Sequence, residues 1–168
     1  MAGEATTSAF QGIDKVIYAR KHGSTDAPKR LPFQTTHNLD MSRDNDSTAT
    51  KDGAVPSIAP LEAELEVEAL SSNHDLYKVF KSSLDNNERL DIWEVNFADK
   101  NEEGLYAATY LEAVVNEISV DNDADDLSSS DITFSVYPTP VDGYTAVSEQ
   151  EQSEVSYAFH AFQEAGNP

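Results

Sequence analysis

The ten residues from Leu61 to Leu70, LEAELEVEAL, alternate apolar side chains with four glutamates. Glutamate favours helices, but a helix would scatter both kinds of side chain around its circumference, whereas a strand separates them onto two faces. The period of two therefore predicts a strand in spite of glutamate's helix propensity. One face of this strand packs on a core, and the other presents carboxylates spaced about 6–7 Å apart. These carboxylates belong to Glu62, Glu64, Glu66 and Glu68.

Other segments show patterns typical of strands and of one helix. We expect strands over 13–21, 33–41, 90–97, 105–120 and 132–137, the long one bent or bulged near Asn116. Apolar residues at helical spacing after the cap formers 71–73 predict an amphipathic helix over 74–85. Residues 148–164 fit a helix or a strand, and we favour a short helical turn followed by a strand. Six or seven strands and one helix predict a mainly β fold, an antiparallel sandwich or barrel with the helix packed on it.

The chain of 168 residues is long enough for one domain with a real core, which we place over 1–168. Residues 1–12 have neither the basic nor the apolar region of a signal peptide and are interpreted as a flexible N-terminal arm. No apolar run is long enough for a membrane span, and the absence of cysteine excludes disulfides and thiol chemistry. The connection over 42–58 is longer than most connections between strands, and 138–168 form a C-terminal extension.

The net charge of −20 is distributed unevenly along the chain. Residues 1–60 hold 7 basic and 7 acidic residues, whereas residues 61–168 hold 4 and 24, with no Lys or Arg after Lys100. A groove that grips nucleic acid needs the opposite sign, which argues against a conventional DNA-binding protein. A protein that lies beside DNA without holding it remains possible, and so does a protein whose acidity simply maintains its solubility.

Motifs that would indicate catalysis or metal binding are absent from the sequence. The four histidines have no spacing typical of a metal site, and His37 is interpreted as a semi-core residue on the apolar face of a strand. The aspartates at 121, 123 and 125 match the first ligands of a calcium loop, but Asp126 replaces the required glycine and Ile132 the required glutamate. We therefore expect no catalytic residues, no metal and no cofactor, and predict that the protein is not an enzyme.

Five segments together carry a resemblance to a known family. They are IDKVIYAR (13–20), SRDNDSTATKDG (42–53), LEVEALSSNHD (65–75), RLDIWEVNF (89–97) and YPTPVDGYTAVSEQEQ (137–152). Their order resembles the major tail protein, or tail tube protein, of siphoviruses: long, non-contractile-tailed phages of Gram-positive bacteria, of the lactococcal phage type. The resemblance covers nearly the whole chain, and the segment 42–53 is its most specific part. The additional immunoglobulin-like domain of some tail tube proteins is not expected here.

The resemblance implies a tail-tube fold of two packed antiparallel sheets with one flanking helix. It implies hexameric rings whose inner sheets join into a shared β-barrel, and rings that self-assemble into a stacked tube. Such a tube holds the tape measure protein, meets the distal tail and tail terminator proteins at its ends, and conducts double-stranded DNA transiently and without sequence recognition during genome ejection. The implied location is the virion, after synthesis in the host bacterial cytoplasm, with no membrane contact.

Two sets of residues are candidates for this function. The resemblance implies that the long loop reaches the neighbouring ring through Arg43, Asp44, Asn45, Asp46, Ser47, Lys51, Asp52 and Gly53. The strand pattern, combined with the family's acidic bore, leads us to expect Glu62, Glu64, Glu66 and Glu68 in the lumen of the tube.

Two alternatives remain open at this point. The first is an acidic soluble binding module with a cation or partner site at 121–131. The second is a carbohydrate-active sandwich enzyme that uses a pair of carboxylates which the sequence does not identify. Electron microscopy of the purified protein separates a tube or ring from both.

Overall fold

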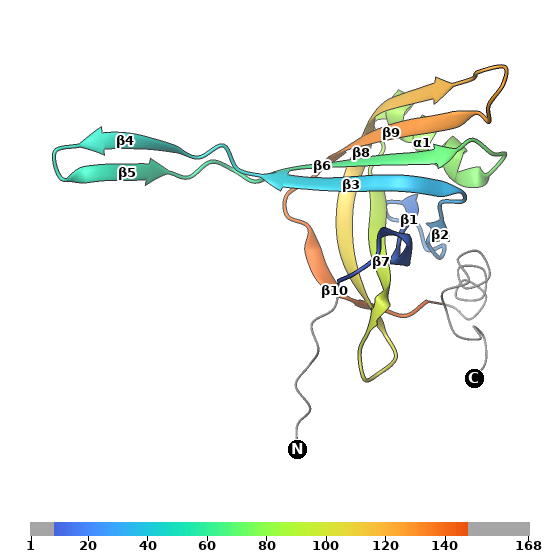
Figure 1. Ribbon diagram of the computed structural model, residues 1–168, viewed down its shortest axis with the longest axis horizontal. Helices are drawn as coiled ribbons and strands as arrows, with labels where there is room; N and C mark the ends of the chain where they lie inside the picture. The colour runs from blue at the N-terminus through green and yellow to red at the C-terminus, as the bar shows by residue number, and fades with distance from the viewer. Residues whose placement is uncertain (1–8, 148–168) are drawn as a thin grey trace.

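The computed structural model describes residues 9–147, and the helix or strand predicted over 148–164 lies outside this range. The described chain contains ten strands, one α-helix and a short 3-10 helix, and none of its helices is long and apolar enough to cross a membrane. The elements, shown in Figure 1, are η1 (Gly12–Asp14), β1 (Lys15–Lys21), β2 (Lys29–Arg30), β3 (Gln34–Ser42), β4 (Asp46–Thr50), β5 (Gly53–Ser57), β6 (Glu62–Leu70), α1 (Asp75–Asn86), β7 (Leu90–Lys100), β8 (Tyr106–Asp121), β9 (Ser129–Val136) and β10 (Val141–Thr145).

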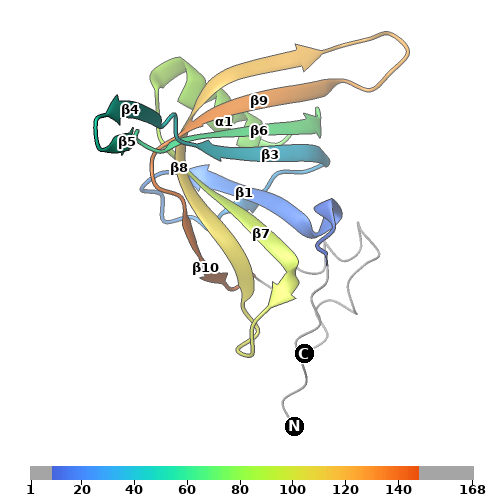
Figure 2. The ribbon, with the colours of Figure 1, turned by 60° about the vertical axis from the view of Figure 1, so that its left-hand side comes forward.

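Eight of the strands form one antiparallel sheet that is folded into two layers. The strand order is β2-β1-β7-β8-β9-β6-β3, and β10 pairs with β8. The first half of β8 pairs with β7 and β10, whereas its second half, from Ala113 onward, pairs with β9. We call β2, β1, β7, β10 and the first half of β8 the first layer, and the second half of β8 with β9, β6 and β3 the second layer. The strands of the two layers cross one another (Figures 1 and 2).

The bend that separates the layers lies within β8. The pairing of β8 with β9 shifts register between Val115 and Glu117, which confirms the irregularity predicted near Asn116. The two-sheet sandwich with a flanking helix is likewise confirmed, although its layers share a strand and are not separate sheets. Four described strands were missed by the prediction of six or seven: β2, β4, β5 and β10. None of the four contains a buried residue, so they lack the apolar alternation that predicted the others.

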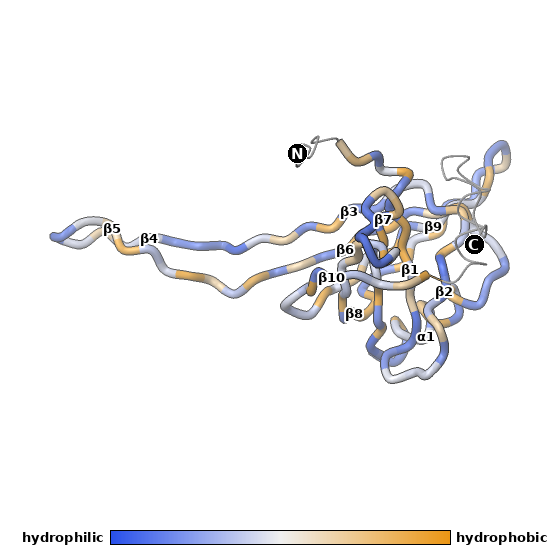
Figure 3. The backbone as a smooth tube through the Cα atoms, turned by 90° about the horizontal axis from the view of Figure 1, so that it is seen from below, coloured by the Kyte–Doolittle hydropathy of each residue, from blue (hydrophilic) through white to orange (hydrophobic). Residues whose placement is uncertain are grey.

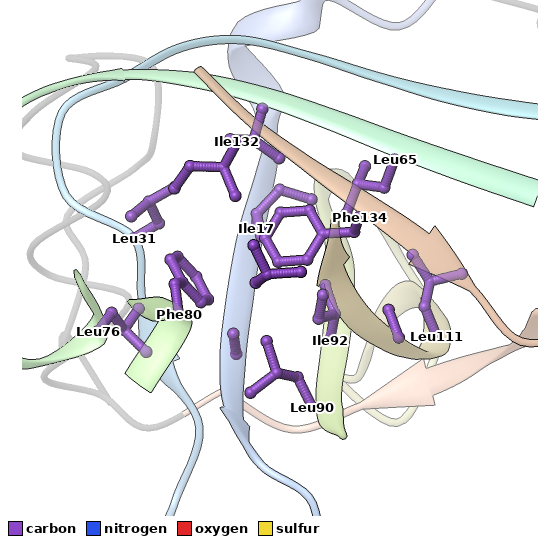
Figure 4. Packing of buried hydrophobic residues seen from close by; sticks show 14 of the residues in the cluster. Ile17, Leu31, Leu65, Leu76, Phe80, Leu90, Ile92, Leu111, Ile132 and Phe134 are labelled. Atoms are coloured by element: carbon purple, nitrogen blue, oxygen red, sulfur yellow. The ribbon is translucent and has the colours of Figure 1, made fainter. Parts of the chain in front are cut away.

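The main hydrophobic core lies between the two layers and beneath α1. It contains Ile17 and Ile92 from the first layer, Leu65 and Phe134 from the second, and Phe80 from the helix (Figure 4). The rings of Phe80 and Phe134 meet edge to face with their centroids 5.3 Å apart, a favourable geometry for an aromatic pair. The helix therefore closes one end of the core and contacts both layers.

Helix α1 starts one residue later than predicted, and its cap is a different residue. His74, and not one of the polar residues 71–73, is the N-cap: its Nδ1 accepts a hydrogen bond from the backbone N–H of Tyr77 at 3.1 Å. An imidazole nitrogen satisfies the same orphan donor as a Ser or Asn oxygen. Partial burial lowers the pKa of His74, which favours the neutral ring that can accept this bond. The helix ends at Asn86 and is followed by the C-cap Asn87, whose left-handed conformation (φ 53°) terminates it.

A buried serine connects α1 to the bend in β8. The Ser83 hydroxyl donates to the carbonyl of Glu88 at 2.6 Å and accepts from the N–H of Val115 at 3.0 Å. Val115 is the residue at which the β8–β9 register shifts. A bulge leaves backbone groups without their ladder partners, and Ser83, whose exposure is 0%, supplies one partner from the helix.

Candidate functional site

The outward face of the second layer is acidic. On β6 the glutamates point away from the core, Glu62, Glu64 and Glu66 being exposed and Glu68 half-buried, while Leu65, Val67 and Ala69 are buried on the other face. The strand and its division into two faces agree with the sequence prediction.

Neighbouring strands extend this acidic face on both sides. Glu64 lies opposite Asp40 of β3, and Glu68 lies opposite Asp131 of β9. Most of the remaining positions that share the face are polar or acidic as well, and the exceptions, Val114 and Leu70, are half-buried. Together they present eight carboxylates: Asp40, Glu62, Glu64, Glu66, Glu68, Glu117, Asp121 and Asp131. The alternation in SSDITFSV (129–136) could have indicated the β9 members of this face, but the register that aligns them with β6 required the structure.

Basic residues are absent from the second layer. Its described strand segments, 34–42, 62–70, 113–121 and 129–136, contain no Lys or Arg. Nine of the eleven basic residues lie in β1, β2, β7 and α1 or in the segment that joins α1 to β7; the other two, Arg43 and Lys51, lie in the connection over 42–58. The charge asymmetry read along the sequence is thus also an asymmetry between two layers. A surface of this kind repels a phosphate backbone.

Among residues 9–147, the second layer has two strands whose outer edge is open. One is β3, which ends the strand order, and the other is the part of β8 beyond Ala113, where the pairing with β7 has ended. Successive strands in the layer run antiparallel, so its two edge strands point in opposite directions. Open edges of this kind can pair with another chain.

Residues 46–57 form a β-hairpin within the connection predicted over 42–58. Strands β4 and β5 pair with each other only, and all ten of their residues are exposed. The hairpin continues the β3–β6 ribbon away from the body of the domain (Figures 1 and 3). At its tip the Thr50 hydroxyl donates to the carbonyl of Gly53 at 2.5 Å and accepts from the N–H of Asp52 at 3.2 Å. Gly53 has φ 119°, which a side chain would strain.

The root of the hairpin is held by two side chains. Arg43 Nη1 donates to the carbonyl of Ala59 at 2.9 Å, and Asn45 Oδ1 accepts from the N–H of the same residue at 2.8 Å. These bonds bridge the interval in which the strand ladder is interrupted, between β3–β6 and β4–β5. Of the eight loop residues selected from the sequence, Arg43 and Asn45 are therefore engaged within the subunit. Asp44 lies between them and is exposed. The other five lie along the exposed hairpin, where the Asp46 carboxylate accepts from the N–H of Ser47 at 2.8 Å.

A hydrogen bond between His37 and Glu94 ties the edge strand β3 to the first layer. His37 Nε2 lies 2.8 Å from Glu94 Oε2, and Lys15 Nζ lies 3.8 Å from Glu94 Oε1. The hydrogen bond from His37 lowers the pKa of Glu94, against the opposing effect of burial. His37 is half-buried with its ring nitrogen bonded, as the sequence interpretation expected. The three residues line a groove of about 730 Å³ beside the open edge of β3, together with Ile13, Met41 and Thr109.

Within residues 9–147, no group of three or more His, Asp or Glu side chains is arranged to hold a metal ion. The aspartates of the turn between β8 and β9 are exposed.

The sequence matches one protein family, and the fold resembles several solved structures. Residues 9–142 match the family model described as phage tail tube protein. No curated protein matches the chain. Among solved structures, the SPP1 tail tube is similar, with a TM-score of 0.73 and 16% identity over 83% of this chain and 81% of that chain. The tail of an empty gene transfer agent particle gives a TM-score of 0.62 and 10% identity, over 82% of this chain and 100% of that chain. The anti-feeding prophage baseplate gives a TM-score of 0.59 and 12% identity, over 85% of this chain and 100% of that chain. At these identities the structural matches show a shared fold.

Proposed function

The chain belongs to the phage tail tube protein family, and on this premise we propose that six copies close into a ring and that the rings stack into the tube of a long, non-contractile tail. The protein is then a structural component of the virion, without catalytic activity. The observation that carries the proposal is the second layer: four strands with two open edges, one strongly acidic face and no basic residue among them.

Ring closure follows from the direction of the strands. The four strands of the second layer alternate in direction, so the β8 edge of one copy meets the β3 edge of the next in an antiparallel arrangement. A contact between two different edges repeats around a ring until it closes. Six copies then contribute four strands each to a continuous barrel. With strands about 4.8 Å apart and tilted by about 40°, such a barrel is about 48 Å across at the backbone, which leaves a bore wider than a DNA duplex.

Burial supports the assignment of the acidic face to the bore. The apolar face of the second layer is covered by the first layer and α1, so only the acidic face is left for the lumen. Carboxylates that lie directly opposite one another, such as those of Glu64 and Asp40, destabilise a sheet by roughly 0.2–1 kcal/mol per pair. A bore that must let phosphates slide past without binding gives a reason for tolerating this cost. The tube would hold the tape measure protein before ejection.

Stacking is assigned to the β4–β5 hairpin. From Ser42 to Lys51 the chain runs nine residues, so the tip lies about 30 Å beyond the end of β3, far enough to contact an adjacent ring. Arg43 and Asn45 set the direction of the hairpin through Ala59. The exposed residues along it make the inter-ring contacts: Asp44, Asp46, Ser47, Lys51, Asp52 and Gly53. The same surfaces would meet the distal tail and tail terminator proteins at the ends of the tube.

Disulfide mapping tests the ring, because the chain has no cysteine of its own. The double variant Asn38→Cys/Ser119→Cys places one thiol on each open edge, three strands apart within a copy and too far apart to bridge internally. Asn38→Cys/Glu117→Cys tests the neighbouring register. In one of these variants, oxidation is expected to yield a series of disulfide-linked oligomers, a ladder whose largest member contains six copies of the chain.

The control is Asn38→Cys/Thr133→Cys, because Thr133 occupies the same face on the interior strand β9. It should give no ladder. A ladder that ends at another number would overturn the six-fold ring, and the absence of a ladder in both registers would overturn the edge contact. Electron microscopy of the full chain should show rings or tubes, and a strict monomer at high concentration would contradict the proposal.

A further inference from the structure

A second hydrophobic cluster lies on the outward face of the first layer, away from the main core. It consists of Val16, Tyr18, Val95, Phe97 and Tyr106, all buried. Trp93 and Val147 pack against it. A sheet with apolar residues on both faces needs a covering element on each. Within the described range, the second layer and α1 cover the inner face of the first layer.

A groove of about 320 Å³ lies beside this cluster. Its walls include Tyr18, Arg20, Pro28, Trp93 and Val147. The Arg20 guanidinium lies 5.1 Å from the centre of the Trp93 ring, and its Nε donates to the Asp91 carboxylate at 3.2 Å. The groove is therefore apolar and aromatic at its base, with a fixed cation at its side.

The chain leaves the described range at the groove itself, because Val147 is the last described residue. The 21 residues that follow contain four apolar or aromatic side chains in close succession: Val155, Tyr157, Phe159 and Phe162. They also contain four glutamates and no Lys or Arg. The acidic second layer repels such a segment, whereas nine of the eleven basic residues lie in the strands and helix outside that layer or in the segment that joins α1 to β7. Charge thus directs the segment away from the second layer, and chain continuity and apolar content direct it to the groove on the outward face of the first layer, where Arg20 supplies a cation.

We propose that residues 148–168 dock on the outward face of their own subunit, with the aromatic residues 157, 159 and 162 occupying the groove beside Trp93. The segment then acts as a covering strap for the second hydrophobic cluster. The occupant is the chain's own continuation because Val147 already forms part of the groove wall. This proposal concerns the free subunit and does not depend on tube assembly.

Trp93 reports on the groove directly, because it is the only tryptophan in the chain. In the full chain, we expect Tyr157→Ser/Phe159→Ser/Phe162→Ser to shift the tryptophan emission to longer wavelength and to increase its quenching by acrylamide. The matched control, Gln152→Ser/Gln163→Ser, alters the same segment without removing apolar side chains and should leave both readouts unchanged. Far-UV circular dichroism verifies that the variants keep the strand content of the parent.

Measurements at concentrations where sedimentation shows a monomer separate docking within a subunit from docking between subunits. Equal emission and quenching for the parent and the triple variant in the monomer would overturn the proposal, as would a difference that appears only after assembly. In the monomeric parent, nuclear Overhauser contacts between the Trp93 indole and labelled Phe159 or Phe162 rings provide an independent check. Their absence would also overturn it.

Discussion

Replacement of Ser83 by alanine should destabilise the domain by removing the link between α1 and the bend of β8. In the parent, its hydroxyl satisfies both the N–H of Val115 and the carbonyl of Glu88 in a fully buried position. Each buried polar group left without a partner costs about 1–3 kcal/mol, and the better helix propensity of alanine returns about 0.5 kcal/mol. We therefore expect Ser83→Ala to lower the free energy of unfolding by about 2–5 kcal/mol, a large part of a typical domain's stability of about 5–15 kcal/mol.

Urea unfolding at neutral pH, followed by circular dichroism, measures this loss. The control is Ser82→Ala, which gains the same propensity in the same helix. It gives up two bonds nearer the surface: the 2.6 Å bond from the hydroxyl to the Glu88 carboxylate and the 3.5 Å bond that the hydroxyl accepts from the Asn86 side chain. The Ser83 variant should be clearly the less stable of the two, and hydrogen exchange at the Val115 amide should accelerate in it alone. Equal losses in the two variants, with unchanged exchange at Val115, would refute the reasoning.

Three further predictions concern the assembly surfaces. Replacement of residues 44–60 by Asn-Gly should change the unfolding free energy by less than about 1 kcal/mol, because the hairpin contributes no buried residue; rings should still form but should not stack, and normal tubes in electron micrographs would refute the stacking role. Glu64→Lys combined with Glu66→Lys should permit assembly and slow DNA ejection from virions, and an unchanged ejection rate would count against a lumenal position. The hydrogen bond from His37 lowers the folded-state pKa of Glu94, so its stabilisation is present above the ordinary carboxyl pKa and is lost as the pH falls through the lowered value. The stability difference between the parent and His37→Leu should therefore shrink on acidification over that range, and a difference independent of pH would contradict the assignment.

The strand β6 could be predicted from the sequence because its two faces have opposite chemistry. Its alternation places Leu65 and Val67 in the core and Glu64 and Glu66 outside, and no other regular structure separates them. The bend of β8 was predictable for a similar reason, since the apolar alternation changes phase near Asn116 and the register shifts there. Elements that contact the core can thus be recognised in the sequence by the periodic spacing of their apolar residues.

The hairpin shows no such apolar periodicity, because none of the residues in its two strands is buried. Its strands are defined by their mutual backbone pairing and by the root contacts of Arg43 and Asn45. One local signal was present: Asp52-Gly53 is a dipeptide typical of hairpin turns, and it lies at the tip. The segment was predicted to be a loop because it lacks apolar periodicity, and the turn dipeptide was not taken as evidence for a hairpin.

The open edges of the second layer were also beyond sequence reasoning. Periodicity shows which face of a strand is buried, but strand order decides which strand ends the sheet. Asp40, Glu117 and Asp131 join the four glutamates of β6 only through the registers of β3, β8 and β9. The concentration of carboxylates on one layer is therefore a property of the fold more than of any single motif.

A helical reconstruction of the assembled tube by electron cryomicroscopy tests the central claim most directly. The account predicts six copies per ring, β3 of one copy paired with the second half of β8 of the next, and the side chains of Glu62, Glu64 and Glu66 projecting into the bore. A tube in which the acidic face of the second layer points outward, or in which β3 and β8 remain unpaired between neighbouring copies, would contradict it.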